Sequence, residues 1–299
     1  MQMDQSHKLM GDAVNRLAQQ LEAGDSAQLQ AYLKAMSRFR RYSVGNVLLI
    51  LAQRPDATHV AGFKAWRAMG RHIRRGQHGI VITAPCVRRH KLKENPAGTE
   101  DDEEVYAFRQ AYVFDVSQTE GRALPQPPRA DGDPGQYLVK LRGFVASRGI
   151  ALDYAAELGS AEGVSGGGVI AIRQGLAAAE EFSTLVHELA HELIHHAPDA
   201  TRDKTVVETE AEAVAFVVCQ MVGLDSVVAS SDYIRLYRGS KDTLLASLER
   251  IRSTASVIVD GIVDSGEAQE RAVLAPAPDA RVPVNADSSG GDESWQDCA

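Results

Sequence analysis

Cysteine is scarce in this chain of 299 residues, which contains Cys86, Cys219 and Cys298 and no others. Three widely spaced thiols argue against a disulfide framework and a cysteine-held metal cluster, and they favour a reducing compartment. Long apolar runs are also lacking, since no stretch approaches the roughly 18 residues that cross a bilayer. The first 25 residues contain acids and no apolar core, unlike a signal peptide. We therefore expect a cytoplasmic protein with no membrane partner.

Acidic residues are almost absent from residues 31–93. This stretch contains fourteen Lys and Arg against one acid, Asp56, which gives it a formal charge of +13. Because the whole chain carries −8, the remainder carries −21. A basic block inside an acidic protein predicts a polyanionic partner for that part of the chain alone.

Apolar periodicity predicts an α+β protein, and the length suggests two domains. Helices are expected over 5–23, 26–37, 44–53, 62–69, 136–147, 176–197, 205–222, 231–237 and 241–262, and strands over 80–84, 106–116, 150–154 and 169–172. Ser43 is the expected cap of the third helix, and Pro85 is expected to end the first strand. The acidic stretch 94–104 is expected to form a solvated hairpin loop.

The domain boundaries follow from composition. Residues 121–135 are rich in Pro and Gly and form the expected linker. They separate an N-terminal domain over 1–120, helical with a small β-hairpin, from a C-terminal domain over 136–264. The polar residues 265–299 are expected to be a disordered tail.

Two overlapping H-E-x-x-H motifs lie in the helix expected over 176–197. His187 and His191 form the first, and His191 and His195 the second. Histidines four residues apart share a helix face and can bind one Zn²⁺, with the intervening glutamate as general base. The first pair lies mid-helix among apolar neighbours, whereas His195 stands near Pro198, where helix ends fray. We therefore expect one Zn²⁺ on His187 and His191 with Glu188 as base, and a supporting role for His195 stays open.

A third metal ligand is expected on the following helix, because catalytic zinc takes three protein ligands and keeps one open position. Glu208 and Glu212 share one face of that helix, which is otherwise rich in apolar residues, so a carboxylate there needs a partner. Glu208 is the expected ligand, and Glu212 is expected to hydrogen-bond a ligand histidine. Glu210 faces elsewhere and is expected to be solvated; a purely solvated face is also the alternative for Glu208.

Residues 38–75 combine basic and aromatic side chains, which is typical of single-stranded nucleic-acid binding. The candidate DNA contacts are Arg38, Arg40, Arg41, Tyr42, Arg54, Lys64, Trp66, Arg67, Arg71, Arg74 and Arg75. Trp66 and Phe63, three apart on a short helix, fit a hydrophobic core better than a stacking surface, and Tyr42 fits either. We expect binding that tolerates many DNA sequences.

Two segments resemble a known family. YSVGNVLLILAQRPDATHVAGFKAWRAMGRHIRRGQHGIVITAP (42–85) is similar to the N-terminal single-stranded-DNA-binding domain of ArdC-like antirestriction proteins. STLVHELAHELIHH, followed by ETEAEAVAFVV, resembles their C-terminal zincin-like domain, which is related to ImmA/IrrE metallopeptidases. The resemblance implies a metal held by His187, His191 and Glu208, with Glu188 as base.

Three hypotheses of function remain open. The first is a DNA-binding zinc metallopeptidase that protects or remodels transferred DNA, the second a regulatory peptidase that cleaves a repressor, and the third a non-catalytic antirestriction protein with a structural metal. In the catalytic hypotheses Glu188 removes a proton from water and passes it to the leaving amine. A peptide substrate is expected to pair with the strand at 169–172. Tyr233 and His195 are the candidates for stabilising the oxyanion.

Overall fold

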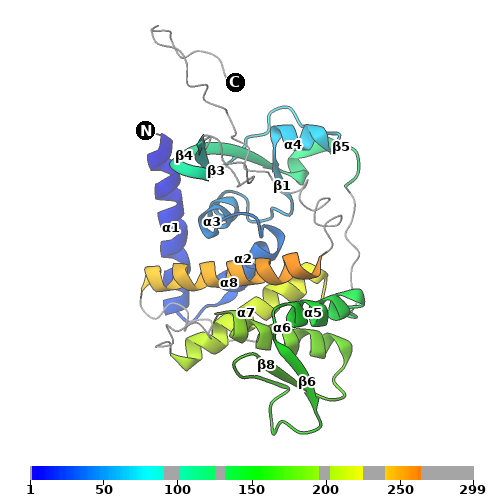
Figure 1. The fold of residues 1–299 in the computed structure, drawn as a ribbon. Helices are drawn as coiled ribbons and strands as arrows, with labels where there is room; N and C mark the ends of the chain where they lie inside the picture. The colour runs from blue at the N-terminus through cyan, green and yellow to red at the C-terminus, as the bar shows by residue number, and fades with distance from the viewer. Residues whose placement is uncertain (1, 91–101, 125–131, 195–202, 225–239, 264–299) are drawn as a thin grey trace.

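The computed structural model of the chain describes residues 2–90, 102–124, 132–194, 203–224 and 240–263 (Figure 1). Its helices are α1 (Gln2–Glu22), α2 (Ala27–Arg38), α3 (Val44–Gln53), α4 (Phe63–Ala68), α5 (Gln136–Ser147), α6 (Ala178–Ile194), α7 (Lys204–Val222) and α8 (Lys241–Ile262), with a 3-10 turn, η1 (Val116–Gln118). None of the helices in these ranges could span a membrane. The helices predicted from apolar periodicity are confirmed wherever the structure describes them. The helix expected over 231–237 lies outside the described residues, together with His195, Tyr233 and the tail.

The strands form three small sheets, so the expectation of a mixed α+β protein is confirmed. They are β1 (Val60–Gly62), β2 (Arg71–Ile73), β3 (Ile80–His90), β4 (Asp102–Asp115), β5 (Thr119–Gly121), β6 (Ala151–Ala155), β7 (Gly163–Ser165) and β8 (Val169–Arg173). The sheets have the strand orders β1-β4-β3, β2-β5 and β6-β8-β7. All neighbours are antiparallel except β6 and β8, which run parallel.

Strand β3 is longer than the sequence predicts. It continues through Pro85, which lies opposite Phe108 of β4, and ends at His90. Pro85 was expected to end the strand, and that prediction is wrong. The reason is that β3 is an edge strand, paired with β4 on one side alone, and an edge position tolerates a residue without an N–H group. Strand β4 begins at Asp102, so the end of the expected acidic loop is also part of the hairpin.

Helix α3 covers the outer edge of β3 with two side-chain amides. Its N-cap is Ser43, as predicted, whose hydroxyl accepts from the Asn46 N–H at 3.3 Å. The Asn46 amide exchanges two 2.8 Å hydrogen bonds with the backbone of Thr83, and the Gln53 amide does the same with Val81 at 2.8 and 2.9 Å. Asn46 and Gln53 are seven residues apart and so lie on one helix face. They satisfy edge groups that would otherwise be open to other strands.

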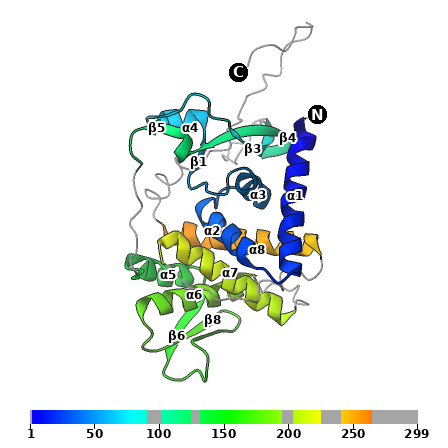
Figure 2. The same ribbon diagram turned by 180° about the vertical axis from the view of Figure 1, so that it is seen from behind.

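The two halves of the chain pack against each other. The β3–β4 hairpin and the β6–β8–β7 sheet lie at opposite ends, with α2, α7 and α8 between them (Figures 1 and 2). Helices α2 and α7 are in contact, and Arg40, just beyond α2, pairs with Asp260 of α8. The buried apolar side chains of both halves form one cluster. The division into domains over 1–120 and 136–264 stays a prediction.

Candidate metal centre

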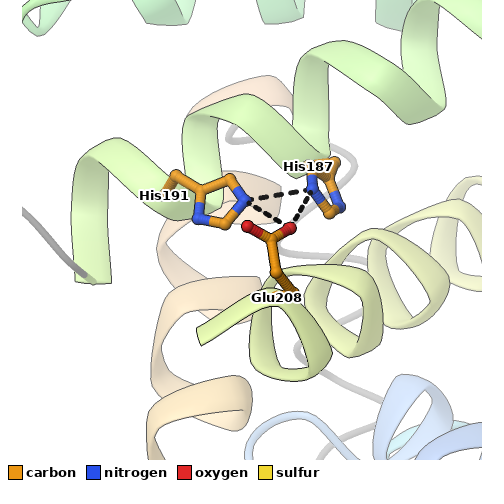
Figure 3. Close-up of side chains that lie close together, drawn as sticks. All are labelled: His187, His191 and Glu208. Carbon is orange, nitrogen blue, oxygen red and sulfur yellow. Dashed lines mark hydrogen bonds and ion pairs between the residues drawn. The ribbon is translucent and has the colours of Figure 1, made fainter. Parts of the chain in front are cut away.

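Helix α6 places the two histidines of the first motif side by side. Apolar neighbours anchor this helix in the core, among them Leu185 and Leu189, which are fully buried. Because these buried neighbours set the rotation of α6 about its axis, they determine the side of the helix on which the His187 and His191 rings lie. Their Nε2 atoms are 3.0 Å apart and their ring planes are inclined by 77° (Figure 3).

Helix α7 brings Glu208 to the same point. The helix begins after Asp203, whose side chain accepts from the Thr205 N–H at 2.9 Å, and Glu208 follows on the first turns. One carboxylate oxygen of Glu208 lies 3.5 Å from Nε2 of His187 and 3.4 Å from Nε2 of His191 (Figure 3). The three side chains that the sequence singled out therefore converge across the gap between α6 and α7, with ligand atoms within 4.8 Å of one another.

The spacing of these three atoms fits one metal ion. Bonds of about 2.0–2.2 Å in tetrahedral geometry separate two ligand atoms by roughly 3.3 Å, and the observed separations run from 3.0 to 3.5 Å. Burial and the neighbouring His191 lower the pKa of His187 to about 4, while Glu208 opposes the shift. Its imidazole is therefore neutral at pH 7, which is the form that binds metals. The Glu208 side chain is 50% exposed, so the cluster opens to solvent.

Glu188 lies beside the cluster in a more buried setting. The residue is 7% exposed, and its pKa is raised by burial and by the charges of Glu208 and Glu192, while a hydrogen bond from Ser165 of β7 opposes the shift. A carboxylate with a raised pKa is a better proton acceptor than an ordinary one at neutral pH. Ser165 thus helps to position this group, and the sequence analysis did not single it out.

Strand β7 is one of the two edge strands of the C-terminal sheet, and among the described strands it pairs with β8 alone. The expectation that a peptide pairs with 169–172 is wrong, because β8 is the central strand, bonded to β6 and to β7. The Glu162 carbonyl accepts from the Arg173 N–H at 2.8 Å, and the Gly166 N–H donates to the Val169 carbonyl at 2.9 Å. The alternation of the strand therefore turns the backbone groups of Gly163 and Ser165 to the outer edge. This edge runs past Glu188 of α6.

Glu210 is not solvated, contrary to expectation. It is fully buried, and its carboxylate accepts from Ser247 Oγ at 2.7 Å and from Arg250 Nε at 3.0 and 3.1 Å. Both partners lie on α8, some 40 positions away in the sequence. Burial of a charged group requires such a partner, and the ion pair ties α7 to α8. The role predicted for Glu212, at intermediate burial, stays a prediction.

Three of the predicted DNA contacts are buried. Trp66 has no exposed surface, and its indole N–H donates to the Phe114 carbonyl at 2.8 Å. Tyr42 is 5% exposed, and its hydroxyl donates to the Val60 carbonyl at 3.3 Å. Arg40 is 9% exposed and faces Asp260. Neither ring presents a face on which a base could stack, so these three assignments are corrected to structural roles.

The other predicted basic contacts are at least partly exposed. Arg71 and Arg74 donate to backbone carbonyls of Arg122 and Ser117, and Arg38 donates to that of Ala57 at 3.3 Å. Arg54 lies 3.6 Å from Asp56. Arg41, Lys64, Arg67 and Arg75 are exposed. The sequence analysis missed an aromatic surface on β4, although alternating aromatic residues signalled it.

Parts of this chain are similar in sequence to known proteins. Residues 8–114 match the family model of the N-terminal domain of anti-restriction factor ArdC. An uncharacterized protein of Bacillus anthracis is 25% identical in an alignment 274 residues long, which covers 76% of this chain and 46% of that relative. The chain therefore spans about half the length of the curated relative that it matches.

Two crystal structures of antirestriction protein ArdC from plasmid R388 share the fold at a TM-score of 0.51 and 17% identity. The metal-free structure is matched over 97% of its chain and 85% of this one, and the Mn(II)-bound structure over 99% and 86%. The resemblance expected from the sequence is thus confirmed: residues 8–114 match the N-terminal domain of anti-restriction factor ArdC, and the chain shares the fold of the antirestriction protein ArdC.

Proposed function

We propose that the chain is a single-stranded-DNA-binding, metal-dependent peptidase that protects incoming mobile DNA in the cytoplasm. The observation that carries this proposal is the convergence of His187, His191 and Glu208, with Glu188 and the open β7 edge beside them. The N-terminal half supports the DNA part, because it matches the ArdC N-terminal domain and contains the basic block. In this proposal the C-terminal half is a zincin-like domain.

We propose one Zn²⁺ per chain as the resident metal. Two imidazoles and one carboxylate form a donor set that zinc uses in catalytic sites, with one position left for substrate or water. Manganese is the competing assignment, because a structure of the ArdC neighbour is described as Mn(II)-bound. Elemental analysis of protein purified without added metal distinguishes the two.

The bound metal would polarise a peptide carbonyl and increase the acidity of water. The residues of the chain supply the rest of the reaction. Glu188, with its raised pKa, takes the proton from the attacking water and delivers it to the amine that leaves. Ser165 holds this carboxylate by a hydrogen bond. The outward backbone groups of Gly163 and Ser165 pair with an extended peptide and place its carbonyl near Glu188.

The test compares Glu188→Gln with wild type and with Glu180→Gln, an exposed acid on the same helix that serves as control. Glu188→Gln should keep metal content and binding to a labelled single-stranded oligonucleotide, because it alters neither the metal ligands nor the N-terminal half. Cleavage of a peptide library and protection of transferred DNA in cells should both fall at least 100-fold. Unchanged protection with Glu188→Gln would discard the catalytic part of the proposal and leave a non-catalytic DNA-binding protein.

The alternative function is a regulatory peptidase that cleaves one repressor protein at the same metal centre. It differs in its readout, because such an enzyme cleaves a single protein when DNA is present and does not protect transferred DNA directly. Three ligands converge among the described residues, which favours catalysis over a purely structural metal, since structural zinc sites have four protein ligands and catalytic sites three.

A further inference from the structure

Strand β4 carries aromatic residues on one of its faces. Phe108, Tyr112 and Phe114 lie an even number of positions apart, with Gln110 between Phe108 and Tyr112, and such residues of a strand point to the same side. Tyr106 lies two positions before Phe108, where the pairing of β4 with β3 shifts in register. Tyr106, Phe108 and Tyr112 are 51%, 56% and 53% exposed. The opposite side of the strand faces the core at Val113, which is 2% exposed. About half of the surface of each of the three rings thus stays open to solvent, in a chain whose aromatic content is 6%.

Two neighbouring residues extend this surface. Phe63, 52% exposed, directly follows Gly62, which pairs with Val113, so Phe63 lies next to the Tyr112 position. On the other side, a Cβ at Gly79 would lie 2.9 Å from Cβ of Tyr112 and 3.3 Å from Cζ of Phe114. The absence of a side chain at Gly79 leaves room for both rings. We call Phe63, Tyr106, Phe108, Tyr112 and Phe114 the aromatic face.

One end of the aromatic face is basic. Gly79 also lines a hollow of about 440 Å³, together with Arg54, Gln77 and His78. Arg74 and Arg75 stand in the turn that precedes this segment and are exposed. Arg67 lies with its guanidinium 6.0 Å from the centre of the Phe63 ring. Asp56, 3.6 Å from Arg54, is the acid among the residues that line the hollow.

We propose that the aromatic face binds single-stranded DNA by stacking its bases, while the phosphates follow Arg54, Arg74 and Arg75. Phe108 and Tyr112 are four strand positions apart, about 13.6 Å, which is roughly four times the stacked-base spacing, so one single strand can reach both rings. The row from Tyr106 to Phe114 extends roughly 27 Å. Charge complementarity favours a polyanion over an apolar protein surface, and exposed rings favour unpaired bases over a duplex. This inference rests on the DNA-binding part of the proposed function, and it replaces Tyr42 and Trp66 as the stacking residues.

The test uses the full chain with a fluorescently labelled oligo(dT) and measures Kd by anisotropy over a series of salt concentrations. Phe108→Ala and Tyr112→Ala should each weaken binding about 5- to 150-fold, the equivalent of about 1–3 kcal/mol per stacked base. The salt slope should stay the same, because no phosphate contact is removed. Phe108→Trp should keep the affinity, and its new indole should be quenched by the oligonucleotide.

Val139→Ala on α5 is the control, because Val139 is 67% exposed and lies in the other half of the chain. It should leave Kd unchanged. If wild type binds the oligonucleotide while Phe108→Ala and Tyr112→Ala bind it equally well, the aromatic face is not the stacking surface, and the DNA-binding function still stands. If wild type does not bind oligo(dT), both this inference and the DNA part of the proposed function are overturned.

Discussion

Gly163 of β7 lies against Glu188 of α6, at a distance that leaves no space for a side chain. A Cβ on Gly163 would be 2.8 Å from Cγ of Glu188, 3.0 Å from its Oε1 and 2.7 Å from Cγ2 of Thr184. These contacts are shorter than carbon atoms tolerate, and two of the atoms belong to the inner part of helix side chains. The close approach brings the open strand edge directly to the expected general base.

Gly163→Ala should therefore displace Glu188 without altering the metal ligands. We expect peptidase activity to fall about 100-fold, as for other misplacements near 1 Å, while metal content is retained. Overpacking should also cost about 1–3 kcal/mol of unfolding free energy. Activity and metal content measured on the same samples test this. Gly166→Ala is the matched control, because a Cβ there meets nothing within 4 Å; equal activity of the two variants would contradict the proposed role of the strand edge.

Glu208 and Glu210 lie two residues apart on α7 and should have separable roles. Glu208→Ala should weaken metal binding by roughly 100-fold or more, beyond the 10–100-fold typical of outer-shell partners. Its effect on the metal-free unfolding free energy should stay within about 0.5 kcal/mol, because the side chain is half exposed. Calorimetric titration with Zn²⁺ and with Mn²⁺ provides the measurement.

Glu210→Ala should show the reverse pattern. Its removal leaves the Arg250 guanidinium without its buried partner, which costs about 3 kcal/mol, the lower end of the usual range because Arg250 is 29% exposed. Urea unfolding of the metal-free protein measures this loss. Intact stability together with lost metal affinity in Glu210→Ala would show that the two roles are assigned the wrong way round.

The local elements were predictable because their signals are local. The Ser43 cap marks the start of α3, apolar periodicity marks α3 and α5, and the four-residue spacing of His187 and His191 determines their shared face. Glu210 was predicted wrongly because its burial depends on Arg250 of α8, and no local pattern shows which distant cation a carboxylate meets.

Strand β7 and the aromatic residues of α4 are two further features that local sequence patterns did not predict. Strand β7 has three residues, one of them Gly163, and is too short to give a periodicity signal. The sequence analysis therefore placed the peptide-binding edge on the more apolar β8 instead. Trp66 and Phe63 share one short helix, yet one is buried and the other half exposed. Trp66 is the one that faces the core, where its indole N–H donates to the backbone carbonyl of Phe114, a residue far away in the sequence.

Asp115 should make part of the stability depend on pH. Burial alone would raise the pKa of this carboxyl, but bonds from the Ser117 hydroxyl and from the backbone N–H groups of Ser117, Thr58 and His59 hold it below its ordinary value. The unfolded chain then binds the proton more readily, so the stabilisation is complete above about pH 4 and is lost as the pH falls through the lower folded-state pKa. Asp115→Asn should cost about 1.5–3 kcal/mol at pH 7. Its difference from wild type should shrink below pH 4 in urea unfolding, and a difference that stays constant down to pH 2 would rule out this assignment.

Arg40 and Arg75 were both expected to contact DNA, and they should now behave differently. Arg40 pairs with Asp260, and its carbonyl accepts from Arg252 and Ser256 at 3.4 Å, so it joins the N-terminal half to α8. Arg40→Gln should lower the unfolding free energy by about 1 kcal/mol, because Asp260 is largely exposed, and should leave the salt slope of oligonucleotide binding unchanged. Arg75 is exposed in the turn before β3, so Arg75→Gln should keep the stability and reduce that slope by about 0.7, the loss of one phosphate contact with a single strand. Anisotropy titrations in a salt series decide between them: a reduced slope in Arg40→Gln would return that residue to the DNA surface.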